Sequence, residues 1–221
     1  MLKADLHVHT VYSIDCVTPL EQIIAHCIEI GINCIAIADH NTIAGALRLK
    51  EMAPFTVIVA EEILTPAGEI MGMFLSEEVP SKLSPEETIA RIKAQNGLVC
   101  IPHPDDRLRS SALKKQVMES IMPQVDIIEV FNSRSLFLSN SAKAWSLTHN
   151  HGKFASAGSD AHTLSEIGHA YVEMPEFNTK DDFLESLAQG RIFGCKSNPL
   201  AHLASTWAKL EKRLFKEKPR C

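Results

Sequence analysis

The sequence has 221 residues, of which 45% are hydrophobic and 22% are charged, and this balance fits one globular domain with a sizeable core. Its formal net charge of −5 argues against a protein that wraps long nucleic acid by charge alone. No apolar run approaches the roughly 20 residues that span a bilayer, so we expect no membrane association.

The cysteines and the first residues bear on the cellular compartment. The six cysteines show no C-x-x-C spacing, and several stand in apolar patterns, where a reduced thiol packs as a small hydrophobe. The first residues lack the basic and apolar stretches of a signal peptide. We therefore expect a cytoplasmic protein.

The first half of the chain alternates predicted strands and helices. Strands are expected over residues 2–10, 33–41, 55–65 and 67–75, the last two joined by a turn at "TPAG". Helices are expected over 18–31, 42–53 and 84–97. Thr18 and Ser84 are the predicted N-caps of the first and third helix, each followed by Pro and then by Glu at the third helical position.

The second half continues the alternation. Strands are expected over residues 98–104, 125–133, 153–162 and 169–175, and helices over 109–124, 139–152 and 179–190. Strand and helix repeated about seven times predict a parallel sheet covered by helices.

Polar residues stand at the carboxyl ends of most of these strands, in "HVH", "ADHN", "AEE", "IPHP", "EVFN" and "GSDAH". An open sheet gathers its ligands at one switch point, whereas a barrel brings all its strand ends to one mouth. We therefore predict an α/β fold with a barrel of seven (β/α) units and a site at that mouth.

We assign residues 1–200 to one domain and residues 201–221 to a basic C-terminal tail, helical or frayed. The last 14 residues carry six Lys or Arg against two Glu, a net charge of +4. A solvated tail is the preferred interpretation, and contact with a polyanion is the alternative.

The strand-end residues have the side chains of metal ligands. His7 and His9 are two apart on a strand, so they point the same way and can chelate one ion. Burying such imidazoles together with carboxylates would be costly without metals. The remaining strand-end donors are Asp15, Asp39, His40, Glu61, Glu62, His103, Asp160 and His162. This set of nitrogen and oxygen donors suits Zn, Mn or Fe.

Five segments, "DLHVHT", "DHN", "EEI", "PHP" and "GSDAH", stand in an order that resembles the PHP (polymerase and histidinol phosphatase) domain family, over roughly residues 1–175. The resemblance implies a distorted (β/α)7 barrel with two or three divalent metal ions at the carboxyl ends of the strands.

The resemblance also implies ligands for each ion. The three sets are His7, His9, Glu62 and Asp160; Glu62, shared with the first set, and His103; and Asp15, His40 and His162. Asn132 or Glu129 would complete the second set, and of the two we take Asn132 as the candidate ligand. Asp5 and Asp39 are expected to orient imidazoles rather than to bind an ion.

Three divalent ions would make this mouth positive in a negative chain, which favours a small phosphate ester. A hydroxide bridging two ions could attack phosphorus directly, so no catalytic side chain is required. The candidates for phosphate binding, each also interpretable as a solvated loop residue, are Arg107, Arg109, Arg134 and His169. His169 stands where the family pattern has an arginine.

We therefore predict a metal-dependent phosphoric ester hydrolase acting on a small phosphorylated metabolite, most readily a nucleotide or nucleoside bisphosphate. The alternatives are a 5′–3′ exonuclease on short oligonucleotides and a histidinol phosphatase. A non-catalytic metal-binding domain is least favoured, because all eight principal positions carry competent ligands. Nothing in the sequence indicates an obligate protein partner.

Overall fold

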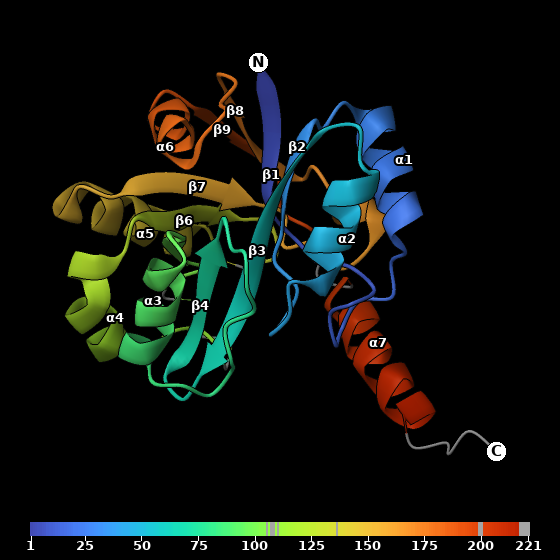
Figure 1. Ribbon diagram of the computed structural model, residues 1–221, viewed down its shortest axis with the longest axis horizontal. Helices are drawn as coiled ribbons and strands as arrows, with labels where there is room; N and C mark the ends of the chain where they lie inside the picture. The colour runs from blue at the N-terminus through green and yellow to red at the C-terminus, as the bar shows by residue number, and fades with distance from the viewer. Residues whose placement is uncertain (105, 107–108, 110, 136, 199–200, 217–221) are drawn as a thin grey trace.

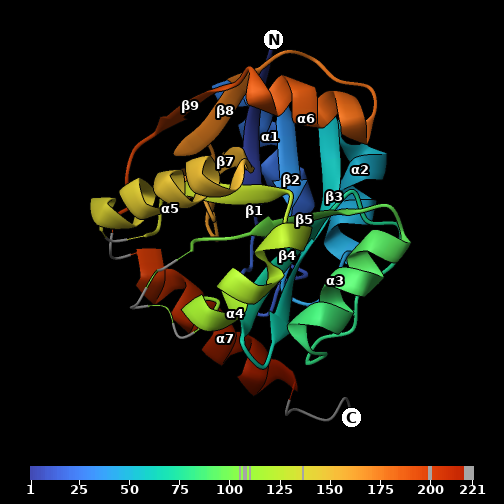
Figure 2. The ribbon, with the colours of Figure 1, turned by 90° about the vertical axis from the view of Figure 1, so that its left-hand side faces the viewer.

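The computed structural model describes residues 1–104, 106, 109, 111–135, 137–198 and 201–216. Over these residues, nine strands form one sheet in the order β7-β6-β5-β4-β3-β2-β1-β8-β9. The sheet curls into a nearly closed barrel with helices around it (Figures 1 and 2). The predicted barrel-like α/β fold is thus confirmed.

Two parallel sections build most of the barrel. The first consists of β1 (Leu2–Val8), α1 (Leu20–Ile30), β2 (Cys34–Ile37), α2 (Ala44–Met52) and β3 (Thr56–Thr65). The second consists of β5 (Leu98–Ile101), α4 (Lys115–Ile121), the 3-10 turn η1 (Met122–Gln124), β6 (Ile127–Asn132), α5 (Leu138–His151) and β7 (Phe154–Gly158).

Antiparallel strands depart from the simple alternation that the sequence predicts. β4 (Gly68–Met73) forms a hairpin with β3, as expected from the "TPAG" turn. Its other edge pairs antiparallel with β5, which follows β4 in the chain after α3 (Pro85–Ala94). On the other edge of β1 lies β8 (Ala170–Met174), antiparallel to β1, and beyond it lies β9 (Arg191–Gly194), antiparallel to β8. The 3-10 turn η2 (Leu164–Glu166) precedes β8, and α6 (Lys180–Ala188) connects β8 to β9.

Hydrogen bonds join β1 and the residues after β7 at the mouth of the barrel. The N–H of Asp160 donates to His7 O at 2.7 Å, and the N–H of His9 donates to Ala161 O at 3.0 Å. The approach is close enough to need glycine at the end of β7, since a Cβ on Gly158 would lie 2.3 Å from the Cβ of His7. The first and last thirds of the chain therefore share one edge of the site.

Two apolar clusters occupy the two faces of the sheet. Ile35 and Ile37 of β2 pack into the larger cluster beneath the helices, while Ala36 and Ala38 belong to the smaller cluster, which Phe183 of α6 joins. This alternation along a strand is the period of two expected of a sheet buried on both faces.

The predicted N-cap is confirmed for α3 and is wrong for α1. Ser84 and Glu87 form the predicted capping box of α3. α1 instead begins at Leu20 without a side-chain cap, because the hydroxyl of Thr18 donates to His162 O at 3.3 Å. Thr18 therefore ties α1 to the mouth of the barrel.

The chain ends in α7 (Ala201–Lys216), which lies at the end of the barrel opposite α6, near the carboxyl ends of β1 and β2 (Figures 1 and 2). Within the described part of the chain, no helix is both long and apolar enough to cross a membrane.

Candidate metal centre

Imidazoles and carboxylates gather at the mouth of the barrel, and they come from several strand ends. The fully or almost fully buried members are His7, His9, Asp15, Glu62, His103 and Asp160. His40 and His162 complete the group with slightly greater exposure. The structure thus brings together all eight of the principal ligands that the family resemblance implies.

One cluster of donor atoms lies between β1, β3 and the end of β7. His9 Nε2 lies 3.2 Å from Asp160 Oδ1 and 3.6 Å from Glu62 Oε2. His7 Nε2 lies 3.5 Å from Glu62 Oε2. Donors about 2.1 Å from one ion at tetrahedral angles are about 3.4 Å apart, so this spacing suits a single metal ion.

A second cluster forms around Asp15, whose Oδ2 lies 3.1 Å from both His40 Nε2 and His162 Nε2. His9 offers a further nitrogen within the same group, and all four donor atoms lie within 4.8 Å of one another. The donors here are three imidazoles and one carboxylate, whereas the first cluster has two of each.

A third cluster contains Glu69 of β4, a residue absent from the sequence-based set. His40 Nδ1 lies 3.2 Å from Glu62 Oε2 and 3.6 Å from Glu69 Oε1. His103 Nε2 lies 2.8 Å from Glu62 Oε1 and 3.7 Å from Glu69 Oε2. The two nitrogens of His40 therefore face two different clusters.

The unsatisfied donors and acceptors at the mouth test whether metal ions fit. Among the described residues, five buried polar atoms there have no hydrogen-bond partner: His9 Nδ1, Glu62 Oε2, Glu69 Oε2, His103 Nδ1 and Asp160 Oδ1. Three of these are carboxylate oxygens that point into the clusters, and buried orphan oxygens are costly unless something binds them. The residues present fit divalent cations.

The charge states of His9 and Asp160 also suit cations, whereas His40 must lose a proton before it can bind one. Burial, together with the neighbouring His162, lowers the pKa of His9 to about 3, so its imidazole is neutral and can bind an ion. Burial opposes charge on Asp160, but Arg109, His7 and the neighbouring imidazoles together outweigh it and hold the pKa of that carboxyl well below its usual value. Burial likewise works against charge on His40, yet the surrounding carboxylates raise its pKa to about 9.

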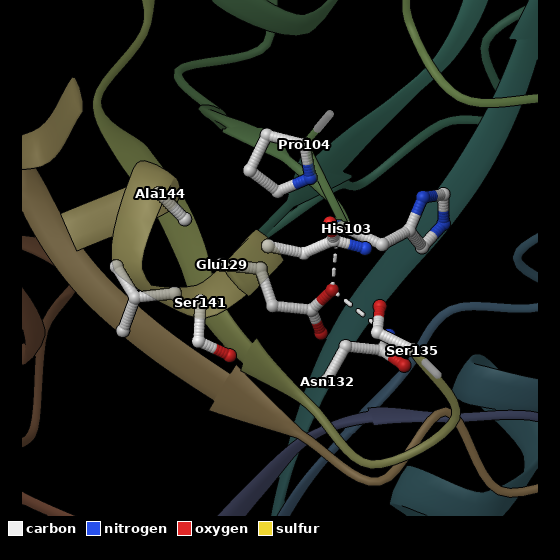
Figure 3. Close-up of a pocket in the computed structure, with 9 residues that line it drawn as sticks. His103, Pro104, Glu129, Asn132, Ser135, Ser141 and Ala144 are labelled. Atoms are coloured by element: carbon white, nitrogen blue, oxygen red, sulfur yellow. Dashed lines mark hydrogen bonds between the residues drawn. The ribbon is translucent and has the colours of Figure 1, made fainter. Parts of the chain in front are cut away.

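Glu129 lies behind the ligands and contacts three neighbours, of which His103 and Asn132 are drawn in Figure 3. Its carboxylate lies 3.0 Å from His7 Nδ1, accepts from the N–H of His103 at 2.7 Å and accepts from Asn132 Nδ2 at 3.0 Å. The same carboxylate borders a small pocket that reaches the first turns of α5. These contacts suit a residue that orients His7.

Asn132 is also committed to neighbours. Its amide donates to Glu129 and, at 3.2 Å, to Asp160 Oδ2, and its oxygen accepts from the N–H of Arg134 at 3.0 Å. Asn132 and Glu129, the two candidates for completing the second ligand set, are thus both engaged in hydrogen bonds. The acid that lies in the cluster with His103 is instead Glu69.

Asp5 and Asp39 are both buried, but they hold the backbone rather than imidazoles. Asp5 accepts from the N–H groups of Ser159 and Gly168, each at 2.9 Å. Asp39 accepts from the N–H and hydroxyl of Thr10, both at 2.6 Å. The expectation that they orient imidazoles is wrong; they fix the loops that carry the ligands.

Two of the candidate ligands have unusual backbone geometry. His103 and Asp160 have φ angles of 30° and 55°, a region that side-chain-bearing residues rarely adopt. Such strain tends to occur at functional sites, where the surroundings hold it in place.

Comparison with known proteins identifies the family. The model described as "PHP domain" matches residues 5–63, and the model described as "PHP-associated" matches residues 139–192. Two uncharacterized proteins of Methanocaldococcus jannaschii are 36% identical over 180 residues and 39% identical over 145 residues. These alignments cover 80% and 60% of this chain, and 72% and 82% of the respective relatives. The chain belongs to the PHP family.

Solved structures share the PHP fold. A Bacteroides vulgatus two-domain protein containing a predicted PHP-like metal-dependent phosphoesterase aligns with a TM-score of 0.72 at 17% identity, over 88% of this chain. Only 65% of that protein is covered, so this chain spans less than two thirds of it. A Chromobacterium violaceum amidohydrolase, solved with bound sulfate and no metal, aligns with a TM-score of 0.63 at 16% identity, over 86% of this chain and 97% of its own.

The four candidate phosphate-binding residues of this PHP domain have different surroundings. Arg109 lies at the mouth, 2.6 Å from Asp160 Oδ2. Arg134 is buried, contacts His162 and Glu166, and donates to Ser205 Oγ at 3.0 Å. His169 Nδ1 lies 3.2 Å from Ser197 Oγ. Arg107 lies outside the described residues.

Two residues at the mouth escaped the sequence analysis. Glu69 could have been found from the β3–β4 hairpin, whose register pairs Met71 with Glu62 and Glu69 with Leu64. Paired residues of an antiparallel hairpin share a face, so Glu69 lies on the face of Glu62. Lys209 of α7 reaches Asp15, and no sequence signal indicated where that helix would pack.

Proposed function

We propose that this PHP protein is a metal-dependent phosphoesterase that hydrolyses a small phosphorylated substrate, with nucleotides and nucleoside bisphosphates as the leading class. The observation that carries the proposal is the convergence of buried carboxylates and imidazoles at one barrel mouth, with orphan oxygens directed into it.

The proposed ligands form three overlapping sets. They are His7, His9, Glu62 and Asp160; His40, Glu62, Glu69 and His103; and His9, Asp15, His40 and His162. Two or three Zn, Mn or Fe ions held there would activate water and stabilise negative charge on a phosphoryl group. The ligand residues themselves fix the ions, and no serine, cysteine or aspartate nucleophile is needed.

The surrounding residues would position the substrate. Arg109 pairs with Asp160 at the mouth and presents a guanidinium suited to phosphate oxygens. Three divalent ions would outweigh the four ligand carboxylates, so the loaded site would attract an anion.

A hydrolysis assay with reconstituted metal tests the proposal. We expect wild-type protein with added Mn²⁺ to cleave a chromogenic phosphate monoester. Replacing a ligand, in His9→Ala or Asp160→Asn, should lower kcat/KM by at least about 100-fold, because ligand loss disrupts ion binding and charge stabilisation together. His26→Ala on α1 is the matched control, since His26 Nδ1 lies 3.7 Å from Glu29 Oε2 on the same helix.

The substrate panel separates the alternatives. It contains mononucleotides, nucleoside bisphosphates, short 5′-phosphorylated oligonucleotides, histidinol phosphate and a simple amide. A preference for oligonucleotides would favour the exonuclease over the leading proposal. A preference for histidinol phosphate would favour a histidinol phosphatase. No metal-dependent turnover of any phosphate ester would leave the non-catalytic or amide-cleaving interpretation in its place.

We further propose a reducing, cytoplasmic location. Cys16, Cys27, Cys34 and Cys100 are buried free thiols, and burial raises the pKa of Cys27 and Cys34 to about 12. Such thiols serve as small core residues rather than as disulfide partners.

A further inference from the structure

The C-terminal helix α7 exposes its apolar side to solvent and directs a polar side toward the barrel, the opposite of an ordinary surface helix. Leu203, Trp207, Leu210 and Leu214 lie along one side and are 65%, 67%, 50% and 58% exposed. Ser205, Lys209 and Lys212, spaced by four and three residues, lie on the side that faces the barrel. An amphipathic helix normally buries its apolar side, so the inward polar side calls for a reason.

The ends of this polar side are tied to the barrel. Arg134 donates to Ser205 Oγ at 3.0 Å, and the ammonium of Lys212 donates to the carbonyls of Val11 and Ser13 in the loop after β1. These contacts hold α7 across the mouth without the help of Lys209.

Lys209, between those anchors, reaches the candidate metal centre. Its Nζ lies 3.2 Å from Asp15 Oδ2, the oxygen that also lies 3.1 Å from His40 Nε2 and from His162 Nε2. A divalent cation on those donors would repel the ammonium from this oxygen, since like charges a few ångströms apart interact strongly at a shielded site. The Lys209 side chain is 47% exposed, so it has room to move.

We propose that Lys209 is a phosphate-binding residue of this PHP site, supplied by the C-terminal helix and directed to the substrate when Asp15 binds a cation. The inference rests on the proposed function. A lysine ammonium is a compact charge with three donors on a flexible stem, and it can follow a phosphoryl group over a short distance. Lys209 thereby provides a cation on the Asp15 side of the mouth, while Arg109 provides one beside Asp160.

The placement also selects a substrate class. A helix fixed across the mouth leaves less room on the Asp15 side for a polymer chain, and an ammonium there favours a terminal phosphate with two negative charges. The structure therefore assigns Lys209 to phosphate monoesters of small molecules rather than to internal diesters.

Phosphate binding by metal-loaded protein tests the proposal independently of turnover. We expect Lys209→Ala to weaken binding of inorganic phosphate, measured by calorimetry, about tenfold or more, as for the loss of a charged hydrogen bond. Lys209→Arg, which keeps the charge, should restore binding to within about threefold of wild type. The control is Lys115→Ala, which removes a lysine paired with Glu119 on the surface of α4.

Three further measurements complete the design. Metal content, determined by mass spectrometry, should be equal in wild type and Lys209→Ala, and thermal melting should show that both are folded. With a chromogenic monoester as substrate, KM should rise more than kcat falls. A diester should be affected less than the monoester.

The outcomes separate this inference from the proposed function. Unchanged phosphate affinity in Lys209→Ala would overturn it. So would a variant that binds an additional ion with unaltered phosphate affinity, because Lys209 would then only substitute for a cation. If Lys209 governs phosphate binding but no ester is hydrolysed, the proposed function fails and the binding role stands.

Discussion

Glu61 and Glu69 are two buried carboxylates of the same hairpin with opposite surroundings. Glu69 lies on the face of Glu62 and contributes to the cluster with His40 and His103. Glu61 points to the other face, where its Oε2 accepts from the N–H of Val79 at 2.8 Å and burial raises its pKa to about 7. This pair therefore allows one ligand position to be tested against its neighbour.

Replacing Glu69 by Gln should weaken one metal site. The change keeps the size of the side chain but removes a charge from the cluster, so we expect affinity for the most weakly held ion to fall about 10- to 100-fold. Titration with Mn²⁺ followed by calorimetry measures this. Glu61→Gln is the control and should bind ions as wild type does; equal affinities in both variants would remove Glu69 from the ligand set.

At the level of residues, the sequence predicted the imidazoles better than their supports. His7 and His9 were predictable as a pair of ligands because side chains two apart on a strand point the same way. Glu129 was named as a candidate ligand from its place at a strand end, but its contact with His7 depends on pairing between distant strands. Glu69 could be recognised only once the register of the β3–β4 hairpin is known. Asp5 and Asp39 were recognised as supports, but the groups that they hold are set by loops far away in sequence.

At the level of elements, β7 and β1 approach each other closely at the site. Gly158 has no side chain, and a Cβ there would lie 2.7 Å from the backbone N of His7 and 3.0 Å from Glu129 Oε1. Both neighbours belong to the ligand cluster or its support, and the backbone cannot yield as a flexible side chain would.

Gly158→Ala should therefore damage both stability and metal binding. We expect a loss of about 1–3 kcal/mol in the free energy of unfolding, from overpacking, together with weaker binding of at least one ion. Denaturant unfolding and metal titration measure the two effects. Gly152→Ala is the control, since its φ of 59° strains any side chain but nothing lies within 4 Å of the added Cβ. If both variants bind metal normally, the contact with His7 is unimportant.

The alternation of elements was predictable because it depends on local patterns of apolar residues and turns. The antiparallel direction of β8 was not predictable, since it depends on pairing with β1 at the other end of the chain, and the short strand β9 was not predicted at all. The α3 cap was predictable from Ser84 and Glu87, whereas Thr18 was drawn away from α1 by a carbonyl distant in sequence.

At the level of the whole molecule, the metal clusters would join distant parts of the chain. Ligand residues come from β1, from the loops after β1, β2, β5 and β7, and from the β3–β4 hairpin. Ions that bind the folded chain and not the unfolded one stabilise it by mass action. Their removal leaves ionised carboxylates facing one another at the mouth.

Removal of metal by a chelator should lower the melting temperature. With free ion at about 1,000 times its dissociation constant, one site contributes about 4 kcal/mol, which corresponds to roughly 8–16 °C for a chain of this size. Differential scanning calorimetry before and after addition of Mn²⁺ measures the shift. His9→Ala should show a smaller shift and His26→Ala the full one; identical melting curves with and without ion would contradict metal binding at the barrel mouth.

The inverted orientation of α7 has a calorimetric consequence. Leu203, Trp207, Leu210 and Leu214 are already largely in water when the helix is docked, so undocking α7 exposes little new apolar surface from them. The heat capacity of such an opening would be small, because heat capacity follows newly hydrated apolar area. Ionic strength would govern it instead, since Lys209 and Lys212 hold the helix through charged and polar contacts.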